Sequence, residues 1–164
     1  MRWLEVDTRN CSVQAALDIV GQKWSLLIVR ELFNGVHRFD EIQQHIGISE
    51  AVLARRLREL RDADLVESRE YREPGSRTRR EYRLTASGLD LFPVVIALLN
   101  WGDKHRAPNA GGSWQVRHRE CGEQVAAVVT CPAHPATPLD HRHTVTNAGP
   151  DAIAITPGHG SEAD

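Results

Sequence analysis

The sequence predicts an α+β fold in which helices dominate and one β-hairpin supplies the strands of the main domain. Several segments repeat apolar residues at helical spacing, and two short strand-like runs flank a loop that contains Pro74-Gly75. The length of 164 residues is that of about one domain with an appendage. With 41% hydrophobic and 26% charged residues, the composition is globular and excludes collagen-like and highly charged disordered classes.

A change in composition after His105 divides the chain. Six of the eight prolines and five of the eight histidines follow that residue, and the helical periodicity stops there. We therefore expect a core domain over 9–105, a loop-rich extension over 106–148 and a disordered tail over 149–164.

No segment has the pattern of a membrane span or an export signal. The longest apolar run covers 94–99, far below the ~20 residues that cross a bilayer. The start, MRWLEVDTRN, lacks the apolar region of a secretory signal. We expect a cytoplasmic protein with no membrane partner, in which Cys11, Cys121 and Cys131 are thiols, metal ligands or redox sensors rather than a disulfide framework.

Helical periodicity predicts several helices in the first half of the core domain. The second of them has the Leu-Ile-Val content of a buried element and ends at Asn34-Gly35. Asp40, followed by Gln43 as in a capping box, is placed to cap the third. The predicted helices span 13–20, 23–33, 41–46 and 50–63.

A short glycine turn joins the third and fourth of these helices. Gly47 suits the left-handed conformation that ends a helix, and Ser49 can cap the next one. Helix, short glycine turn and helix in this order are typical of a helix-turn-helix. The buried side of the fourth helix is defined by leucines at spacings of four and three, namely Leu53, Leu57 and Leu60.

The face of helix 50–63 opposite these leucines is basic. Arginine on the exposed face of the second helix of such a motif suits contacts to guanine edges and phosphates in a major groove. The alternative is a solvated helix with i,i+4 pairs such as Arg55–Glu59. The face is centred on Ala51, Arg55, Arg58 and Asp62, and its flanks carry Arg56 and Arg61.

Two strand-like runs over 65–71 and 79–84 follow this helix. Between Arg69 and Arg83 there are six arginines and three glutamates. A basic hairpin directly after a basic second helix is typical of a wing, which contacts phosphates or the minor groove. The sequence therefore predicts a winged helix-turn-helix that binds double-stranded DNA. The residues expected to contact DNA are Ser49, Ala51, Arg55, Arg56, Arg58, Arg77 and Arg79.

Thr85 is placed to cap a final long helix over 86–105, in which Pro93 would introduce a kink. Apolar residues cover nearly the whole circumference of this helix, so it must be buried on all sides. A small winged domain cannot supply that burial, and we expect a second copy of the chain to do so. A two-fold dimer is also what a helix-turn-helix needs to read paired half-sites. The expected interface residues are Phe92, Ile96, Leu98, Leu99 and Trp101.

Many short motifs occur in one order along residues 9–105. They are Cys11-Ser12-Val13, Ala16-Leu17-Asp18, Gly21-Gln22-Lys23-Trp24-Ser25-Leu26-Leu27-Ile28, Arg30-Glu31-Leu32, Gly35, Arg38-Phe39-Asp40-Glu41-Ile42, Ile48-Ser49, Val52-Leu53, Arg55-Arg56-Leu57-Arg58-Glu59-Leu60, Leu65-Val66, Tyr82, Leu84-Thr85, Gly88 and Trp101-Gly102. With these motifs the sequence resembles the HxlR family of bacterial winged-helix transcriptional regulators, relatives of the MarR group.

The resemblance implies a winged helix-turn-helix with extra N- and C-terminal dimerisation helices and a small C-terminal β-ribbon-like extension. It implies a homodimer that binds operator DNA, and we expect a repressor that responds to a small-molecule or redox signal. In some relatives a cysteine at the position of Cys11 senses oxidants, thiol stress or aldehydes. This chain departs from many relatives by having Ser12 instead of proline after that cysteine, and it has Asn10 before it.

Cys11 therefore has two interpretations. It precedes the first helix, where free amide groups and the helix dipole favour a thiolate, which is typical of a sensor. The alternative is a buried cysteine that packs under the dimer-forming helices.

The extension contains His118-x-x-Cys121 and Cys131-x-x-His134, which are compatible with a small zinc ribbon. His141 and His143 are alternative ligands. Pro132 inside the second pair and the short stretch between the pairs favour a ribbon without metal. We expect no metal and no cofactor.

Motifs of the common enzyme classes are missing from the sequence. It has no glycine-rich phosphate loop, no nucleophile elbow and no HExxH. We therefore expect a regulator and not an enzyme. The alternative function is a winged-helix module that binds a protein partner without binding DNA.

Overall fold

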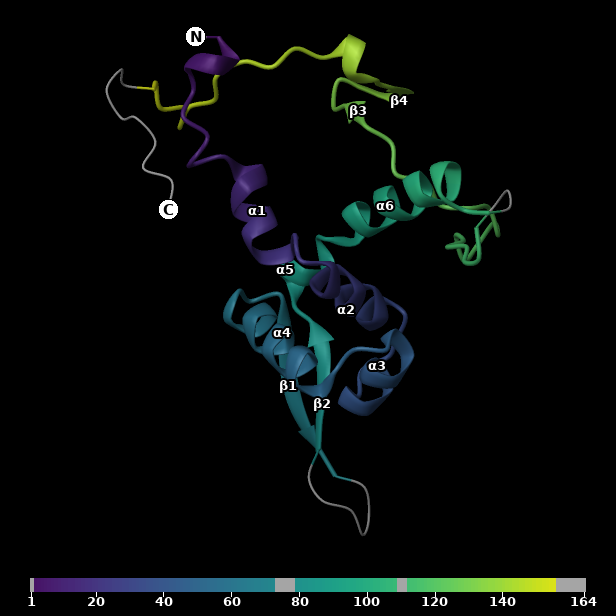
Figure 1. The fold of residues 1–164 in the computed structure, drawn as a ribbon. Helices are drawn as coiled ribbons and strands as arrows, with labels where there is room; N and C mark the ends of the chain where they lie inside the picture. Colours follow the sequence, from purple (N-terminus) through teal and green to yellow (C-terminus); the bar gives the residue numbers. More distant parts are fainter. Residues whose placement is uncertain (1, 73–78, 109–111, 156–164) are drawn as a thin grey trace. The chain divides into compact units, whose positions relative to one another are not determined.

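The computed structural model describes residues 2–72, 79–108 and 112–155 (Figure 1). The chain forms two compact units, one of residues 19–128 and one of residues 1–18 with 129–164. Helices and small antiparallel sheets make up the chain, so the predicted α+β class is confirmed. Within the described residues no helix has both the length and the apolar character needed to span a membrane.

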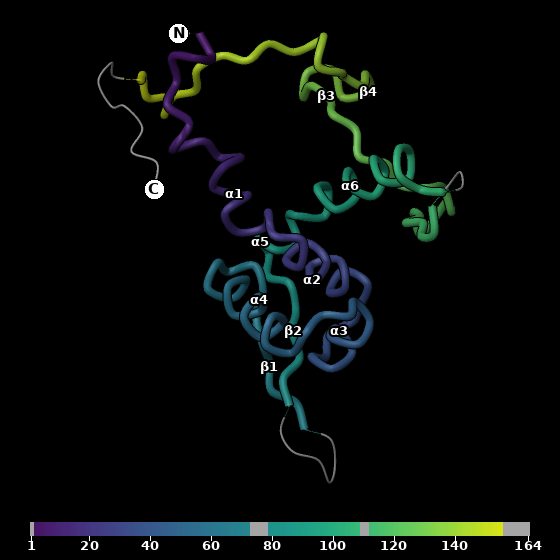
Figure 2. The backbone as a smooth tube through the Cα atoms, in the orientation of Figure 1, coloured from purple at the N-terminus to yellow at the C-terminus, as the bar shows by residue number. Residues whose placement is uncertain are grey.

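The unit of residues 19–128 is built on a β-hairpin of β1 (Val66–Tyr71) and β2 (Arg79–Leu84). Figure 2 shows α2 (Lys23–Phe33), α3 (Phe39–Ile46) and α4 (Glu50–Asp62) gathered around that hairpin. Their buried apolar side chains form one core, which fixes the face that each helix leaves to solvent. The core includes Ile28, Leu32, Ile42, Ile48, Leu53, Leu57, Leu60, Leu65, Val66 and Tyr82.

The segment before α3 pairs with the free side of β2 through a single β-bridge. The strands pair antiparallel from Val66↔Leu84 to Tyr71↔Arg79, and Arg38 bridges Glu81 on the outer side of β2. The extended backbone at Arg38 lets α3 begin at Phe39, with Arg38 as its N-cap. The prediction that Asp40 caps this helix was therefore wrong, because Asp40 already lies in the first turn.

The turn of the helix-turn-helix lies at the predicted residues, although the side-chain cap expected from Ser49 is not formed. Gly47 ends α3 with a left-handed backbone at φ 67°, a conformation that glycine adopts without steric cost. Ser49 is the N-cap of α4, and its carbonyl accepts a hydrogen bond from the Leu53 amide at 2.9 Å. The Ser49 hydroxyl accepts no capping hydrogen bond from a described residue.

The predicted long helix over 86–105 is two helices, α5 (Ala86–Leu89) and α6 (Phe92–His105). Thr85 caps α5 as predicted, because its hydroxyl accepts a hydrogen bond from the Gly88 amide. The backbone of Gly88 lies against the Leu65 carbonyl so closely that a Cβ atom would meet that oxygen at 2.1 Å. Pro93 sits in the first turn of α6, where its missing N–H removes no hydrogen bond, so the predicted kink inside a helix was wrong.

The other unit joins the two ends of the chain. It contains η1 (Trp3–Glu5), most of α1 (Ser12–Val20), the hairpin of β3 (Thr130–Cys131) and β4 (His134–Pro138), and η2 (His141–His143). Val6 bridges Ala154, and the Asp7 amide donates to the Ile153 carbonyl at 2.7 Å.

Candidate nucleic-acid interface

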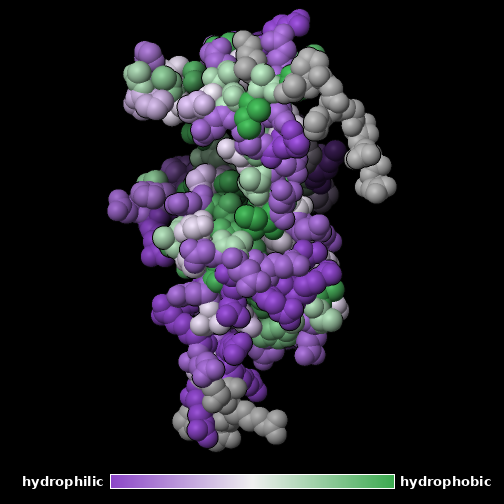
Figure 3. All heavy atoms as spheres, turned by 90° about the vertical axis from the view of Figure 1, so that its left-hand side faces the viewer, coloured by the Kyte–Doolittle hydropathy of each residue, from purple (hydrophilic) through white to green (hydrophobic). Residues whose placement is uncertain are grey.

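The core positions the exposed face of α4. Leu53, Leu57 and Leu60 are buried, so the opposite side of the helix, which carries Ala51, Arg55 and Arg58, faces solvent. In Figure 3 hydrophilic residues predominate over α4 and the β1–β2 hairpin on the face in view. The local sequence thus produces a helix with one side in the core and one polar side.

The arginines of α4 differ in how freely they can reach a ligand. Arg55 is 57% exposed and lies 4.0 Å from the Glu59 carboxylate, a weak tie. Arg56 is only 14% exposed and donates to Glu59 at 2.5 Å. Arg58 is exposed and forms no ion pair or side-chain hydrogen bond with a described residue. Of these three arginines Arg58 is therefore the most available guanidinium, and Arg56 is the least; Arg61, near the end of the helix, is exposed as well.

A buried carboxylate ties α3 to α2. Glu31 is 2% exposed and accepts hydrogen bonds from the Arg30 guanidinium and from His45 Nδ1, both at 2.6 Å. A buried charge of this kind is stable only when it is paired and hydrogen-bonded. The link orients the first helix of the motif, and Glu31 was not among the predicted site residues. A charged residue at a core position of helix 23–33 was the signal that could have found it.

The hairpin carries arginines whose charges are partly neutralised by neighbours. Arg79 lies 3.7 Å from the Asp40 carboxylate. Arg83 donates to Glu81 at 2.9 Å, and this hydrogen bond lowers the pKa of the Glu81 carboxyl. Arg80 is exposed and forms no ion pair with any residue that the structure describes. Arg77, the other predicted wing contact, lies outside the described residues.

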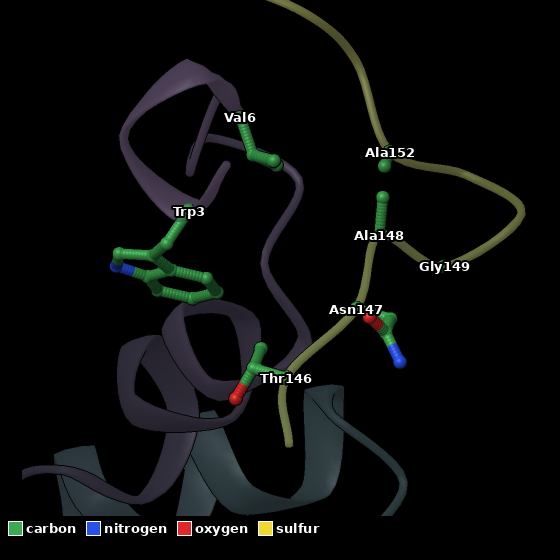
Figure 4. A pocket seen from close by; sticks show the side chains of 7 residues that line it. All are labelled: Trp3, Val6, Thr146, Asn147, Ala148, Gly149 and Ala152. Carbon is green, nitrogen blue, oxygen red and sulfur yellow. The ribbon is translucent and has the colours of Figure 1, made fainter. Parts of the chain in front are cut away.

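A cleft of about 500 Å³ opens between α3, α4 and the hairpin. The first turns of the two helices form one side, and the ends of the strands form the other. Its lining residues are Phe39, Asp40, Glu50, Ala54, Tyr71, Arg79, Arg80 and Tyr82. A second cavity, in the other unit, measures only about 90 Å³, is lined by Trp3 and residues of the C-terminal segment, and has no charged side chain in its wall (Figure 4).

Helix α6 presents apolar side chains to solvent. Ile96 is buried and Leu99 half-buried, while Phe92 is exposed and Leu98 and Trp101 are 51% and 53% exposed. An edge-to-face contact between Phe92 and Phe33, with ring centres 5.3 Å apart, holds the start of the helix on α2. The remaining apolar face has no cover within the described chain.

The cysteines are all free thiols. Cys11 is partly exposed and directly precedes α1, and its carbonyl accepts a hydrogen bond from the Ala15 amide at 3.0 Å. In the described part of the chain no three His, Cys, Asp or Glu side chains gather into a group that could hold a metal.

The two predicted Cys–His pairs have local contacts of their own. His118 Nδ1 lies 3.2 Å from Cys121 Sγ, and Cys131 is the cross-strand partner of His134. These pairs belong to different compact units. His143, a predicted alternative ligand, pairs with Asp140 at 3.0 Å, and His141 begins η2.

Comparison with known proteins identifies the family. Residues 19–110 match the model of the HxlR-like helix-turn-helix. The HTH-type transcriptional regulator Rv3095 of Mycobacterium tuberculosis is 37% identical over 139 residues, which cover 85% of this chain and 86% of Rv3095. YdeP of Bacillus subtilis, another HTH-type transcriptional regulator, is 32% identical over 61% of this chain and 77% of its own length.

Solved structures agree with this assignment. The crystal structure of PA1607 is 31% identical, with a TM-score of 0.73 over 85% of this chain and 95% of that one. The redox regulator HypR in its reduced form is 29% identical, with a TM-score of 0.51 over 57% of this chain and 92% of HypR. The chain therefore belongs to the HxlR-like helix-turn-helix family of transcriptional regulators.

Proposed function

We propose that this chain is a homodimeric repressor that binds double-stranded operator DNA. In this proposal α4 enters the major groove, and the β1–β2 hairpin contacts the neighbouring phosphates or minor groove. The observation that carries it is the two-sided character of α4. Three leucines hold one side in the core, and Arg55 and Arg58 stand exposed on the other.

The contact residues take different roles in this proposal. Ser49 and Ala51 are at the N-terminal end of α4, the end that approaches base edges in helix-turn-helix proteins. Arg58 and Arg55 have the reach and the donors for guanine edges or phosphates. Arg56 supports the helix through Glu59 more than it contacts DNA. In the hairpin, Arg79 and Arg77 contact phosphates.

The proposed dimer is supported by the uncovered apolar face of α6. Leu98 and Trp101 would remain half in water in a monomer, and burying such side chains against a second copy is favourable. A two-fold axis through this face gives two copies of α4 for two half-sites. The proposed interface residues are Phe92, Ile96, Leu98, Leu99 and Trp101.

The proposed signal is a small molecule or an oxidant. Similarity to HypR, whose reduced and oxidised forms match with TM-scores of 0.51 and 0.53, supports a redox response. Cys11 is the proposed sensor, since it precedes α1 with its side chain partly exposed. We place the regulator in the cytoplasm, where it meets the operator.

Selection of duplexes from a random library, followed by footprinting of the selected sequence, tests this function. We expect a protected site with two half-sites about one DNA turn apart. We also expect affinity for random duplex to fall steeply with salt, because each phosphate contact releases counterions. A protein that binds no duplex at low salt would refute the proposal and favour the protein-binding alternative.

A further inference from the structure

A short antiparallel ribbon joins the N-terminal segment of the chain to its C-terminal segment. Val6 forms a β-bridge with Ala154. On either side of this bridge the two main chains are joined by hydrogen bonds of 2.7 and 2.8 Å, which the Asp7 and Ile155 amides donate. A turn over residues 149–152 directs the C-terminal segment into this pairing. The roles proposed above do not involve the ribbon.

The turn that precedes α1 is anchored to this C-terminal segment at both ends. At its start the Asp7 amide is bonded to the ribbon, and the Asp7 carboxylate accepts hydrogen bonds from the Arg9 amide at 2.9 Å and the Arg9 guanidinium at 2.6 Å. The hydrogen bond from the guanidinium lowers the pKa of the Asp7 carboxyl to about 2, so this carboxylate is charged at neutral pH. At its end Asn10 Nδ2 donates to the Asp151 carbonyl at 2.5 Å, and the Cys11 amide donates back into the turn at 3.0 Å. Cys11 therefore directly follows a turn whose shape depends on the C-terminal segment.

Few apolar contacts hold the two segments together. Trp3 is 59% exposed, and Ile153 and Ile155 are 56% and 54% exposed, so the apolar side chains of the ribbon stay largely in water. The side chains of Val6 and Ala152 line the same small cavity (Figure 4), so the packing beside the ribbon is also incomplete. A contact that rests on a few hydrogen bonds opens at a low free energy while the rest of the fold stays intact.

We propose that residues 151–155 form a strap that opens locally, and that the closed strap fixes the turn before α1 and limits the access of solutes to the Cys11 thiol. When the strap opens, the turn loses the anchors at the Asp7 amide and the Asn10 side chain together. The C-terminal segment thereby sets how fast the thiol meets an oxidant. The regulatory meaning of the strap rests on the proposed function, in which Cys11 is the sensor, but its opening is measured without DNA.

Alkylation of Cys11 by iodoacetamide, followed by peptide mass spectrometry, measures the opening of the strap. Ile155→Pro removes one donor of the ribbon, and Asn10→Ala removes the side-chain anchor. We expect each change to accelerate the alkylation of Cys11 by about two- to tenfold, the factor that one hydrogen bond of ordinary net strength contributes. Cys121, in the other compact unit, is the internal reference and should react at an unchanged rate.

Two matched variants control for the substitutions themselves. The Ala154 amide donates to no main-chain carbonyl of the described residues, because the geometry of the bridge leaves it on the outer side of the ribbon. Ala154→Pro therefore introduces the same residue where no hydrogen bond is lost. Asn147→Ala removes an exposed asparagine of the C-terminal segment. In both variants Cys11 should be alkylated as fast as in the wild type.

A cross-link tests the strap in the opposite direction. Val6 and Ala154 are bridge partners without a hydrogen bond between them, a pairing in which the Cα atoms are about 4.5 Å apart and a disulfide can form. The double variant Val6→Cys with Ala154→Cys is oxidised, and the new bond is confirmed by peptide mapping. We expect the cross-link to slow deuterium exchange of the amides of residues 7–11 several-fold, and reduction to restore the wild-type rates.

The outcomes separate the strap from the function on which its meaning rests. Equal alkylation of Cys11 in the wild type, Ile155→Pro and Asn10→Ala overturns the strap, and so does unchanged exchange at residues 7–11 in the cross-linked protein. Equal acceleration in Ala154→Pro and Ile155→Pro also overturns it, because the lost hydrogen bond would then not be the cause. A wild type that binds no duplex, or that keeps its operator when Cys11 is oxidised, overturns the proposed function or its sensor and leaves the strap standing.

Discussion

Helices α4 and α6 belong to the same unit, but α4 buries its apolar side in the core while α6 leaves much of its apolar side exposed. α4 buries Leu53, Leu57 and Leu60 and turns its charged residues to solvent, so its fold is complete within one chain. α6 buries Ile96 and leaves larger apolar side chains exposed, so its burial is incomplete. The difference shows which partner each surface fits. A polar face with free guanidiniums suits a polyanion, and an uncovered apolar face suits another apolar face.

The largest expected effect comes from the core side of α4. Leu57→Ala removes a side chain that is 2% exposed, and we expect the free energy of unfolding to fall by about 2–5 kcal/mol because a cavity remains. Chemical denaturation followed by circular dichroism measures it. Leu57→Met, which keeps the volume, should cost less than about 1.5 kcal/mol. Equal stability of all three proteins would mean that α4 is not anchored as described.

On α6 we expect loss of assembly rather than loss of fold. Leu98→Asp places a charge in the proposed dimer contact, where it would have no partner. The variant should sediment as a monomer or aggregate, and its operator affinity should fall by about 100-fold or more, because two linked half-site contacts become one. Leu4→Asp, at an exposed site outside α6, is the control. A folded Leu98→Asp dimer at micromolar concentration would place the interface elsewhere.

Periodicity predicted the elements of this comparison well. Helix 23–33 and strand 79–84 match α2 and β2 at both ends, because Asn34-Gly35 and the alternation of the strand are strong local signals. The sequence misplaced the start of α3. The bridge of Arg38 to Glu81 sets that start, and it joins residues distant in the chain. Local capping rules cannot anticipate such a contact.

The candidate site was only partly accessible from sequence. A helical wheel finds the exposed face of α4, but it cannot show that Glu59 holds Arg56 while Arg58 stays free. The same holds for the Glu31–His45 link and for the cleft around Tyr71, since each joins different elements. The break between α5 and α6 was missed because Asp90 and Leu91 carry no strong helix-ending signal.

Truncation of the arginines on α4 tests its polar side. Arg58→Ala and Arg55→Ala should each weaken operator binding by about 1–3 kcal/mol if they contact bases, and relax sequence preference at one position. Because Arg58 is free and Arg55 is tied to Glu59, we expect the larger loss at Arg58. Arg56→Ala should have the smallest effect on sequence preference. Competition binding against single-base variants of the operator measures both the loss of affinity and the change in sequence preference for each variant.

The hairpin arginines should behave differently from those of α4. Arg79→Ala and Arg77→Ala should weaken binding to all sequences nearly equally and flatten the salt slope, because phosphate contacts carry no base information. The loss for Arg79 should be small, since Asp40 already balances part of its charge. Salt titrations of binding to random duplex measure the loss of affinity and the slope for each variant. Unchanged affinity in all four variants, at Arg55, Arg58, Arg77 and Arg79, would remove this face as the DNA contact.

The smallest effect concerns the signal, and we expect Cys11 rather than Cys121 or Cys131 to carry it. Cys11 adjoins α1, which in the proposed dimer lies beside its two-fold mate. Hydrogen peroxide converts a reactive thiol to a sulfenic acid that dithiothreitol reverses. Such a change beside the two-fold axis would alter the spacing of the two α4 helices, and because half-site spacing is fixed by the DNA turn, operator affinity should fall several-fold.

The measurement follows operator release during peroxide titration of the wild type, Cys11→Ser and the control Cys121→Ser. Release from the wild type and from Cys121→Ser, but not from Cys11→Ser, is the expected result, with recovery on reduction. His118 Nδ1 lies 3.2 Å from Cys121 Sγ, so Cys121 is the other cysteine most able to react with peroxide. The Cys121→Ser control therefore shows whether oxidation of Cys121 contributes to operator release. Equal release from all three proteins would remove Cys11 as the sensor, and release from none would make it a packing residue.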